Sequence, residues 1–248
     1  MYILPYFFLF IFGLIFGSFL NVIIYRIPKN ISIIKPRSFC PKCKKQIPLY
    51  RNIPLLSYII QKGKCHNCLK KISSNYFIVE LIIGVLWMLS FYYFNSLNET
   101  IYFNIISTLL IGIAIIDKKE FIIPLELTIS SLIIIIMYSL IYGNILSNLS
   151  GMIIGLGYLS IIFIITFLIT KKQTLGYGDL QLIFVLGLWI SDIRILLVIF
   201  ISSLIALIIW IIISIKYGFD RNRPLPFGTF LSITSIAIYP IKMDFLIF

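Results

Sequence analysis

Long runs of apolar residues, mostly Ile, Leu and Phe, recur along the whole chain and are separated by short polar segments. Many runs hold about 20 residues, the length with which an α-helix crosses the roughly 30 Å hydrocarbon core of a bilayer. The shorter alternating segments of a membrane β-barrel do not recur. The pattern predicts eight apolar helices, at Met1–Ile24, Tyr76–Phe94, Ile101–Ile116, Phe121–Tyr142, Leu149–Thr170, Gly176–Ile190, Ile195–Ile215 and Phe227–Phe248.

The composition of the chain is that of a membrane protein. Of its 248 residues, 60% are hydrophobic and 12% are charged, whereas roughly a quarter are charged in soluble domains. This excludes an ordinary water-soluble globule and a disordered chain. We predict an all-α polytopic membrane protein with a first transmembrane helix at 1–24, a small loop at 25–75 and a seven-helix membrane core at 76–248. Gly13-x-x-x-Gly17 and Gly151-x-x-x-Gly155 suit close helix packing.

The positive charge of the chain predicts its topology. The loop at 25–75 holds 12 Lys and Arg and no Asp or Glu, and by the positive-inside rule it is cytoplasmic, with the N-terminus outside. With eight spans, 19 of the 21 Lys and Arg residues then lie inside. We therefore interpret the net charge of +12 as a topology signal and expect no nucleic-acid partner. The first span has no basic leader region and no clear cleavage site, which favours a retained signal anchor over a cleaved signal peptide.

Four cysteines in the basic loop form two CxxC pairs, Cys40-Pro-Lys-Cys43 and Cys65-His-Asn-Cys68. Four thiolates complete a tetrahedral site with no open position, which is the pattern of structural zinc. Two disulfides or a redox CxxC are the alternatives, and a cytoplasmic location disfavours stable disulfides. A loop of this size cannot build a large core, so a metal would supply the missing stability. His66, between two candidate ligands, is expected to be a bystander.

Two acids lie at the ends of predicted spans and at similar depth on the cytoplasmic side. Asp117 closes the third span and Asp179 opens the sixth. Two carboxyl groups that share one proton are what an aspartic protease needs, because one takes a proton from water while the other polarises the scissile carbonyl. The helix C-terminus at Asp117 disfavours a carboxylate and the N-terminus at Asp179 favours one. We therefore expect Asp117 to carry the proton and Asp179 to be the base.

Three further residues near these acids and the loop are candidates for supporting roles. Gly176 and Gly178 precede Asp179 and permit close approach of a substrate backbone, although a simple loop-to-helix turn also explains them. Glu80 lies one turn inside the second span. A structural ion pair with the basic loop and the binding of a positive substrate group both remain open for Glu80.

These motifs together resemble the bacterial type IV prepilin peptidases, which are intramembrane aspartic proteases of the GxGD class. The resemblance runs in order over nearly the whole chain. Its motifs are Gly17-Ser-Phe-Leu-Asn-Val-Ile-Ile-Tyr-Arg26, the two CxxC pairs around Asn52-Ile-Pro-Leu-Leu-Ser57, Glu80, Asp117 with Ile123-Pro124, Gly176-Tyr-Gly-Asp179, and Pro226-Phe-Gly-Thr-Phe230. One departure is that the family commonly has an Asp after Ile-Pro, where this chain has Leu125 and then Glu126.

The resemblance implies a function, a location and partners. The enzyme would cut the short basic leader of type IV prepilins or pseudopilins at the cytoplasmic face of the bacterial inner membrane, serving a type IV pilus or protein secretion. Members of this length often also N-methylate the new N-terminus with S-adenosylmethionine. By motif match, Asp117 and Asp179 would be the catalytic pair, and the four cysteines would bind Zn²⁺. The residues that bind the methyl donor stay unassigned, with Gly17, Asn21, Arg26 and Glu80 as candidates that packing or leader binding would explain equally well.

Three other functions compete with the protease interpretation. An ion- or proton-coupled transporter would use paired intramembrane acids, but it predicts carboxylates near the midplane and inverted repeats. A redox protein acting on quinone would need its dithiols outside, whereas the cation count places them inside. A scaffold without catalysis is the third alternative.

Overall fold

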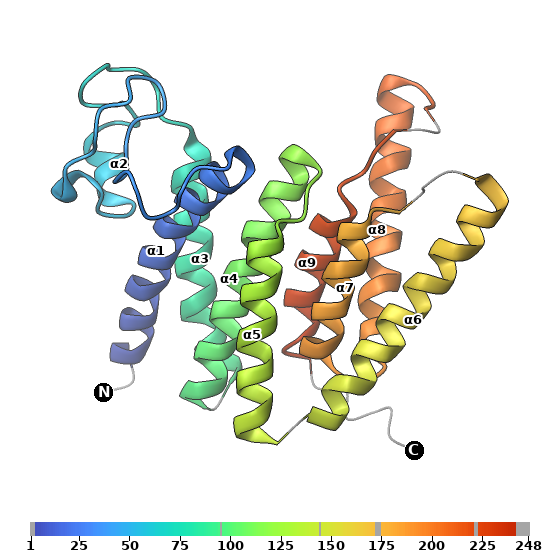
Figure 1. Cartoon of the computed structure of the whole chain (residues 1–248). Helices are drawn as coiled ribbons and strands as arrows, with labels where there is room; N and C mark the ends of the chain where they lie inside the picture. The colour runs from blue at the N-terminus through green and yellow to red at the C-terminus, as the bar shows by residue number, and fades with distance from the viewer. Residues whose placement is uncertain (1–2, 95, 144, 172–174, 221–222, 242–248) are drawn as a thin grey trace. The chain divides into compact units, whose positions relative to one another are not determined.

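The computed structural model describes residues 3–94, 96–143, 145–171, 175–220 and 223–241. Within these ranges the secondary structure is helical apart from two isolated β-bridges, which confirms the predicted all-α fold (Figure 1). The α-helices are α1 (Ile3–Arg26), α2 (Leu56–Ile60), α3 (Ser74–Tyr93), α4 (Leu97–Glu120), α5 (Leu125–Tyr142), α6 (Ile145–Thr170), α7 (Tyr177–Ile190), α8 (Arg194–Tyr217) and α9 (Phe227–Ile238). Two short 3₁₀ helices, η1 (Ile27–Lys29) and η2 (Leu49–Arg51), lie in the loop after α1.

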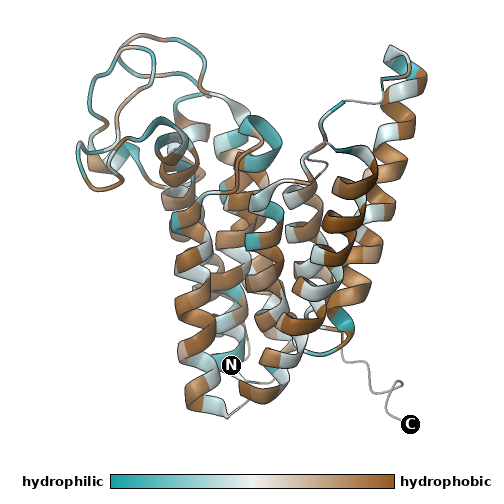
Figure 2. Cartoon of the chain, turned by 45° about the vertical axis from the view of Figure 1, so that its right-hand side comes forward, coloured by the Kyte–Doolittle hydropathy of each residue, from teal (hydrophilic) through white to brown (hydrophobic). Residues whose placement is uncertain are grey.

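Six helices of the described chain are long and apolar enough to cross a membrane, namely α1, α3, α4, α5, α6 and α8. The two remaining predicted spans correspond to the shorter apolar helices α7, of 14 residues, and α9, of 12 residues. The last part of the predicted span at Phe227–Phe248 lies outside the described residues. Hydrophobic residues cover the long helices, and hydrophilic ones gather in the loop after α1 (Figure 2).

The boundary between α4 and α5 differs from the predicted one. We expected the fourth span to begin at Phe121, but α4 continues to Glu120 and α5 begins only at Leu125. Pro124 caps α5, and Phe121 has a left-handed backbone with φ of +55°. Proline disfavours helical conformation in the residue before it, so the helix restarts only after Ile123-Pro124. Asp117 therefore lies inside the last turn of a continuous helix.

The chain forms two compact units, Met1–Thr108 and Leu109–Phe248. In the first unit, α1 packs along α3 through glycines. A Cβ atom added to Gly13 would lie 2.8 Å from the Cα of Gly84, and one added to Gly17 would lie 2.9 Å from the Cα of Glu80. Small residues let helices approach closely in membranes, where apolar burial drives association only weakly. The predicted packing role of Gly13 and Gly17 is confirmed.

The second unit contains a still closer helix contact. A Cβ atom on Gly151 of α6 would lie 2.5 Å from the carbonyl oxygen of Gly187 on α7, and one on Gly155 would lie 2.8 Å from Ile195 of α8. The glycines of α6 therefore allow α7, which carries the candidate acid Asp179 in its first turn, to pack against a long membrane helix. This confirms the packing role predicted for Gly151 and Gly155.

Gly151→Ala is expected to lower the midpoint of thermal unfolding in detergent, with a loss of about 1–3 kcal/mol from overpacking. The matched control is Gly157→Ala on the same helix, where an added Cβ meets nothing within 4 Å. The control should be neutral or slightly stabilising, because Ala favours helix more than Gly. Equal unfolding temperatures for Gly151→Ala and the unmodified protein would contradict the close contact.

Candidate active site and cysteine cluster

The Asp117 carboxylate is buried in the second unit and accepts its hydrogen bonds from the start of α9. Its Oδ2 atom accepts the backbone N–H of Thr229 at 2.7 Å and lies 2.9 Å from the Thr229 hydroxyl. The same hydroxyl lies 2.9 Å from the carbonyl oxygen of Ala114, one turn before Asp117. A carboxyl group away from water is stable only where protein donors replace the lost hydration. Thr229 supplies these donors.

Asp179 lies in the first turn of α7 and is half-buried. Its Oδ2 atom accepts the backbone N–H of Gly176 at 3.2 Å, so the side chain folds back over the start of its own helix. Gly176 has an extended backbone, with φ of −74° and ψ of 143°, and both Gly176 and Tyr177 are exposed. The segment before Asp179 therefore presents an accessible main chain.

Ile123 lies in the link between α4 and α5, and its side chain packs beside both Asp117 and the segment that precedes Asp179. A Cβ atom on Gly178 would lie 3.1 Å from the Ile123 side chain, and one on Gly228 would lie 2.7 Å from it and 3.2 Å from Asp117 Oδ2. Only glycine fits this packing at position 228. The starts of α7 and α9 thus converge on one side chain beside Asp117.

The donors around Asp117 alter the protonation state expected from the helix ends. Asp117 does end α4, but its carboxylate faces the first turn of α9, where free N–H groups favour a negative charge. Asp117 has a backbone N–H and a hydroxyl as neighbours, whereas Asp179 has one N–H. The donor geometry and the chain position therefore favour opposite assignments of the shared proton.

The four cysteines of the first unit form a compact cluster. Their sulfur atoms lie within 4.8 Å of one another, with Cys40 and Cys43 4.0 Å from Cys68 and Cys65 respectively. Four sulfurs bound tetrahedrally at about 2.3 Å from a zinc ion would be roughly 3.8 Å apart. The cluster therefore has the size of a four-thiolate metal site. The N–H groups of Cys68 and Asn67 lower the pKa of the Cys65 thiol to about 7.

The two CxxC segments have the same backbone structure, 25 residues apart. In each, the N–H of the first cysteine donates to the carbonyl five residues later, from Cys40 to Lys45 and from Cys65 to Lys70. The residue after the second cysteine is left-handed in both, with φ of +57° at Lys44 and +54° at Leu69. These tight turns direct two sulfurs from each segment toward one point. His66 is exposed and is not part of the cluster.

Arg26, Asn21 and Glu80 connect the loop to α1 and α3. The Arg26 guanidinium is buried and donates to four backbone carbonyls, those of Ser32, Ile33, Pro36 and Arg37. Asn21 donates to the carbonyl of Tyr76 on α3 at 3.0 Å. Glu80 accepts the N–H of Leu55 at 2.8 Å. Each of these side chains has a definite structural partner.

A cavity of about 760 Å³ lies between the loop and the adjoining ends of α1 and α3. Its wall includes Asn21, Tyr25, Tyr58, Phe77 and Glu80. Arg51 also lines it, and the Nη1 atom of Arg51 is buried without a hydrogen-bond partner in the described part of the chain. The cavity thus combines aromatic surfaces with a buried carboxylate and an unpaired guanidinium nitrogen.

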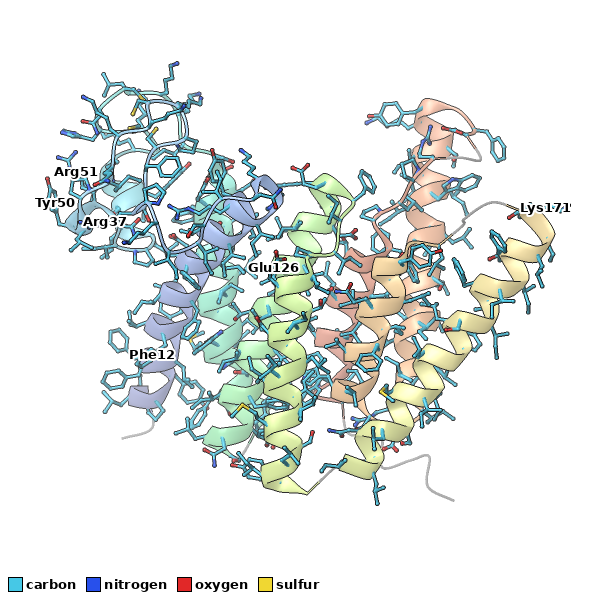
Figure 3. The ribbon with its side chains drawn as sticks, viewed as in Figure 1. Phe12, Arg37, Tyr50, Arg51, Glu126 and Lys171 are labelled. Atoms are coloured by element: carbon cyan, nitrogen blue, oxygen red, sulfur yellow. The ribbon has the colours of Figure 1, made fainter. Side chains whose placement is uncertain are left out.

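Two contacts of the site were not foreseen from the sequence. Thr229 lies in the Pro226–Phe230 motif, and only that motif pointed to its position. Leu55 was not distinguishable from other loop residues, because its contribution is a backbone N–H in a left-handed conformation, with φ of +56°. Glu126, which follows Leu125 at the position where an Asp was expected after Ile123-Pro124, is exposed on the first turn of α5 (Figure 3).

Comparison with known proteins identifies the family. The bacterial peptidase A24 N-terminal domain matches residues 11–94, and the type IV leader peptidase family matches residues 104–211. The chain belongs to the type IV leader peptidase family. It is 31% identical to a prepilin leader peptidase/N-methyltransferase of Neisseria gonorrhoeae over 92% of this chain and 87% of that one. A protein of the same name from Klebsiella pneumoniae is 34% identical over 74% of this chain and 84% of its own. No solved structure matches the chain.

Proposed function

We propose that this protein cleaves the leader peptide of type IV prepilins or pseudopilins at the cytoplasmic face of the bacterial inner membrane and N-methylates the new N-terminus. The observation that carries the peptidase activity is the placement of Asp117 and Asp179 in one unit, at helix ends that converge on Ile123. Family membership supports the reaction and the membrane location. The basic loop supports the cytoplasmic orientation through the positive-inside rule.

The proposed chemistry is general acid–base hydrolysis by the two acids. Asp117, held ionised by Thr229, takes a proton from water as the water oxygen attacks the scissile carbonyl carbon. Asp179, protonated, donates its proton to the carbonyl oxygen, which gives a tetrahedral intermediate. Collapse of the intermediate breaks the C–N bond as Asp117 gives its proton to the leaving amine and Asp179 takes one back from a hydroxyl of the intermediate, which restores both acids to their starting states. Two nearby carboxyl groups readily share one proton, because ionising both is unfavourable.

The substrate would approach through the segment before Asp179. Gly176 and Tyr177 are exposed, and Gly176 is already extended. An extended substrate backbone can therefore approach the main chain here without meeting a side chain at Gly176. The apolar helix of a prepilin would remain in the bilayer while its leader stays in the cytoplasm.

S-adenosylmethionine would bind in the cavity of the first unit. Bound there, it would supply an electrophilic methyl group to the amine released by cleavage. The faces of Tyr25, Tyr58 and Phe77 suit an adenine ring. The Glu80 carboxylate would accept from the ribose hydroxyls, and the unpaired Nη1 of Arg51 would bind the carboxylate of the methionine part. All five residues line the same cavity.

The mass of a synthetic prepilin segment after incubation with the purified protein tests this proposal. Loss of the leader reports cleavage, and the gain of one methyl group when S-adenosylmethionine is added reports methylation. Asp117→Asn and Asp179→Asn should each reduce the cleavage rate about a thousandfold, within the usual range for loss of a general acid or base. Glu126→Gln is the matched control and should cleave normally, because Glu126 is exposed. Near-normal turnover in either Asp variant would remove that residue from the mechanism.

Thr229→Val tests the proposed role of the hydroxyl beside Asp117. Valine keeps the backbone N–H and the side-chain shape but removes the hydroxyl. A hydrogen bond to a charged group is worth about 1.5–3 kcal/mol, so kcat should fall about ten- to a hundredfold while KM changes little. Thr229→Ser should restore most of the rate, since it restores the hydroxyl. Equal rates for the Val and Ser variants would show that the hydroxyl does not position Asp117.

The cysteine cluster is proposed to hold one structural zinc ion. Metal analysis of the purified protein should find about one zinc per chain, and Cys65→Ser should lose it. Loss of the metal should make residues 25–75 sensitive to protease while the helical circular dichroism of the membrane core persists. His66→Ala is the control and should retain zinc, because its side chain is outside the cluster. Protein that contains no zinc when purified without chelators would contradict this assignment.

A further inference from the structure

Several large apolar side chains lie exposed on the basic loop of the first unit. Ile34 is 80% exposed, Leu49 75% and Tyr50 68%. Ile33 is exposed too, and the cations Lys35 and Arg37 lie exposed between these residues in the chain. We call this set of six residues the docking face. Exposed aliphatic side chains beside cations are unusual on a surface that faces only water, and they mark sites of interaction.

The part of the docking face at residues 33–37 is tied to the end of α1 by hydrogen bonds. The buried guanidinium of Arg26, the last residue of α1, donates to the carbonyls of Ser32, Ile33, Pro36 and Arg37. These four bonds fix the segment that carries Ile33, Ile34, Lys35 and Arg37. The segment is therefore kept beside the point where α1 ends.

The docking face is also continuous with the lipid-facing side of α1. A shallow groove of about 200 Å³ is lined by Phe19 of α1 together with Ile33, Ile34, Arg37 and Leu49. Phe19 is 49% exposed on a helix that can span the membrane, so its exposed surface meets lipid. Figure 3 shows Arg37 and Tyr50 on the same side of the loop. This groove connects the lipid-facing side of α1 with the apolar side chains of the docking face.

The charge of the loop indicates what covers this face. The segment 25–75 carries 12 Lys and Arg and no acid, so a second copy of the chain would bring the same charge and be repelled. Aliphatic and tyrosine side chains flanked by Lys and Arg are typical of the boundary between hydrocarbon and lipid headgroups. Anionic headgroups attract such cations strongly at short range.

We propose that the docking face rests on the membrane surface, with Ile33, Ile34, Leu49 and Tyr50 inserted between anionic phospholipids whose headgroups bind Lys35 and Arg37. The loop then lies on the bilayer beside α1 rather than projecting into water. This surface does not include the aspartates or the cysteine cluster. The proposal therefore stands independently of the peptidase mechanism.

Hydrogen exchange of the full-length protein in nanodiscs tests the proposal. Discs with one chain each are prepared from phosphatidylcholine alone or from an equal mixture with phosphatidylglycerol, and exchange is followed by mass spectrometry in peptides covering 31–53. We expect slower exchange in the anionic discs. In the Arg37→Gln, Leu49→Ser variant this difference should largely disappear, since a single cation at an anionic surface accounts for about a fivefold change in the docking equilibrium.

The matched control is Ile60→Ser, Lys62→Gln, which removes one exposed aliphatic side chain and one cation elsewhere on the loop. It should keep the slower exchange in anionic discs. Zinc content and helical circular dichroism, measured for both variants, report whether the loop is still folded. Equal exchange of the unmodified protein in the two disc types would overturn the proposal. An equal loss of the slower exchange in both variants would also overturn it. So would slower exchange that arises only with two chains per disc, because this would identify a second copy of the chain as the occupant.

Discussion

A carboxyl group buried among apolar helices must find its hydrogen-bond partners within the protein, and this constraint organises the second unit. Asp117 meets it through Thr229, whose N–H and hydroxyl both reach one carboxylate oxygen. That contact requires α9 to begin beside the end of α4. This placement in turn requires glycine at position 228, because any larger side chain there would clash with Ile123. The charged group is retained because the surrounding backbone is shaped to hold it.

The apolar pattern predicted the fold well because long membrane helices are recognisable from hydrophobicity alone. It placed the α4–α5 boundary wrongly, since Phe121 and Ile122 are as apolar as the helices on either side. Only the proline at 124 and the left-handed Phe121 separate the two helices. Asp117 and Asp179 were recognisable because acids are rare and costly near the bilayer. The expectation that Asp117 carries the proton considered only its own helix and not the donors of α9, which favour the opposite assignment.

Contacts that involve backbone groups were beyond sequence reasoning. Thr229 resembles the many hydroxyl residues that bond within their own helices, such as Ser131 and Ser139, and only the Pro226–Phe230 motif around it distinguishes it. Arg26 was a candidate for ligand binding, yet it binds four carbonyls of the following loop. Glu80 was a candidate for an ion pair or a substrate contact, and it accepts a backbone N–H from Leu55. These two residues connect a loop with little core to the helices that precede and follow it.

The hydroxyl of Thr229 has a single hydrogen and two acceptors at the same distance, the Ala114 carbonyl and Asp117 Oδ2. Rotation about one C–O bond can turn that hydrogen toward the carboxylate when Asp117 is charged and toward the carbonyl when it is neutral. Both charge states are then accommodated without moving any heavy atom. In the proposed mechanism the site would gain and lose a proton in every catalytic cycle while the tightly packed glycine contacts around it stay fixed, which would keep the reorganisation energy of each transfer small.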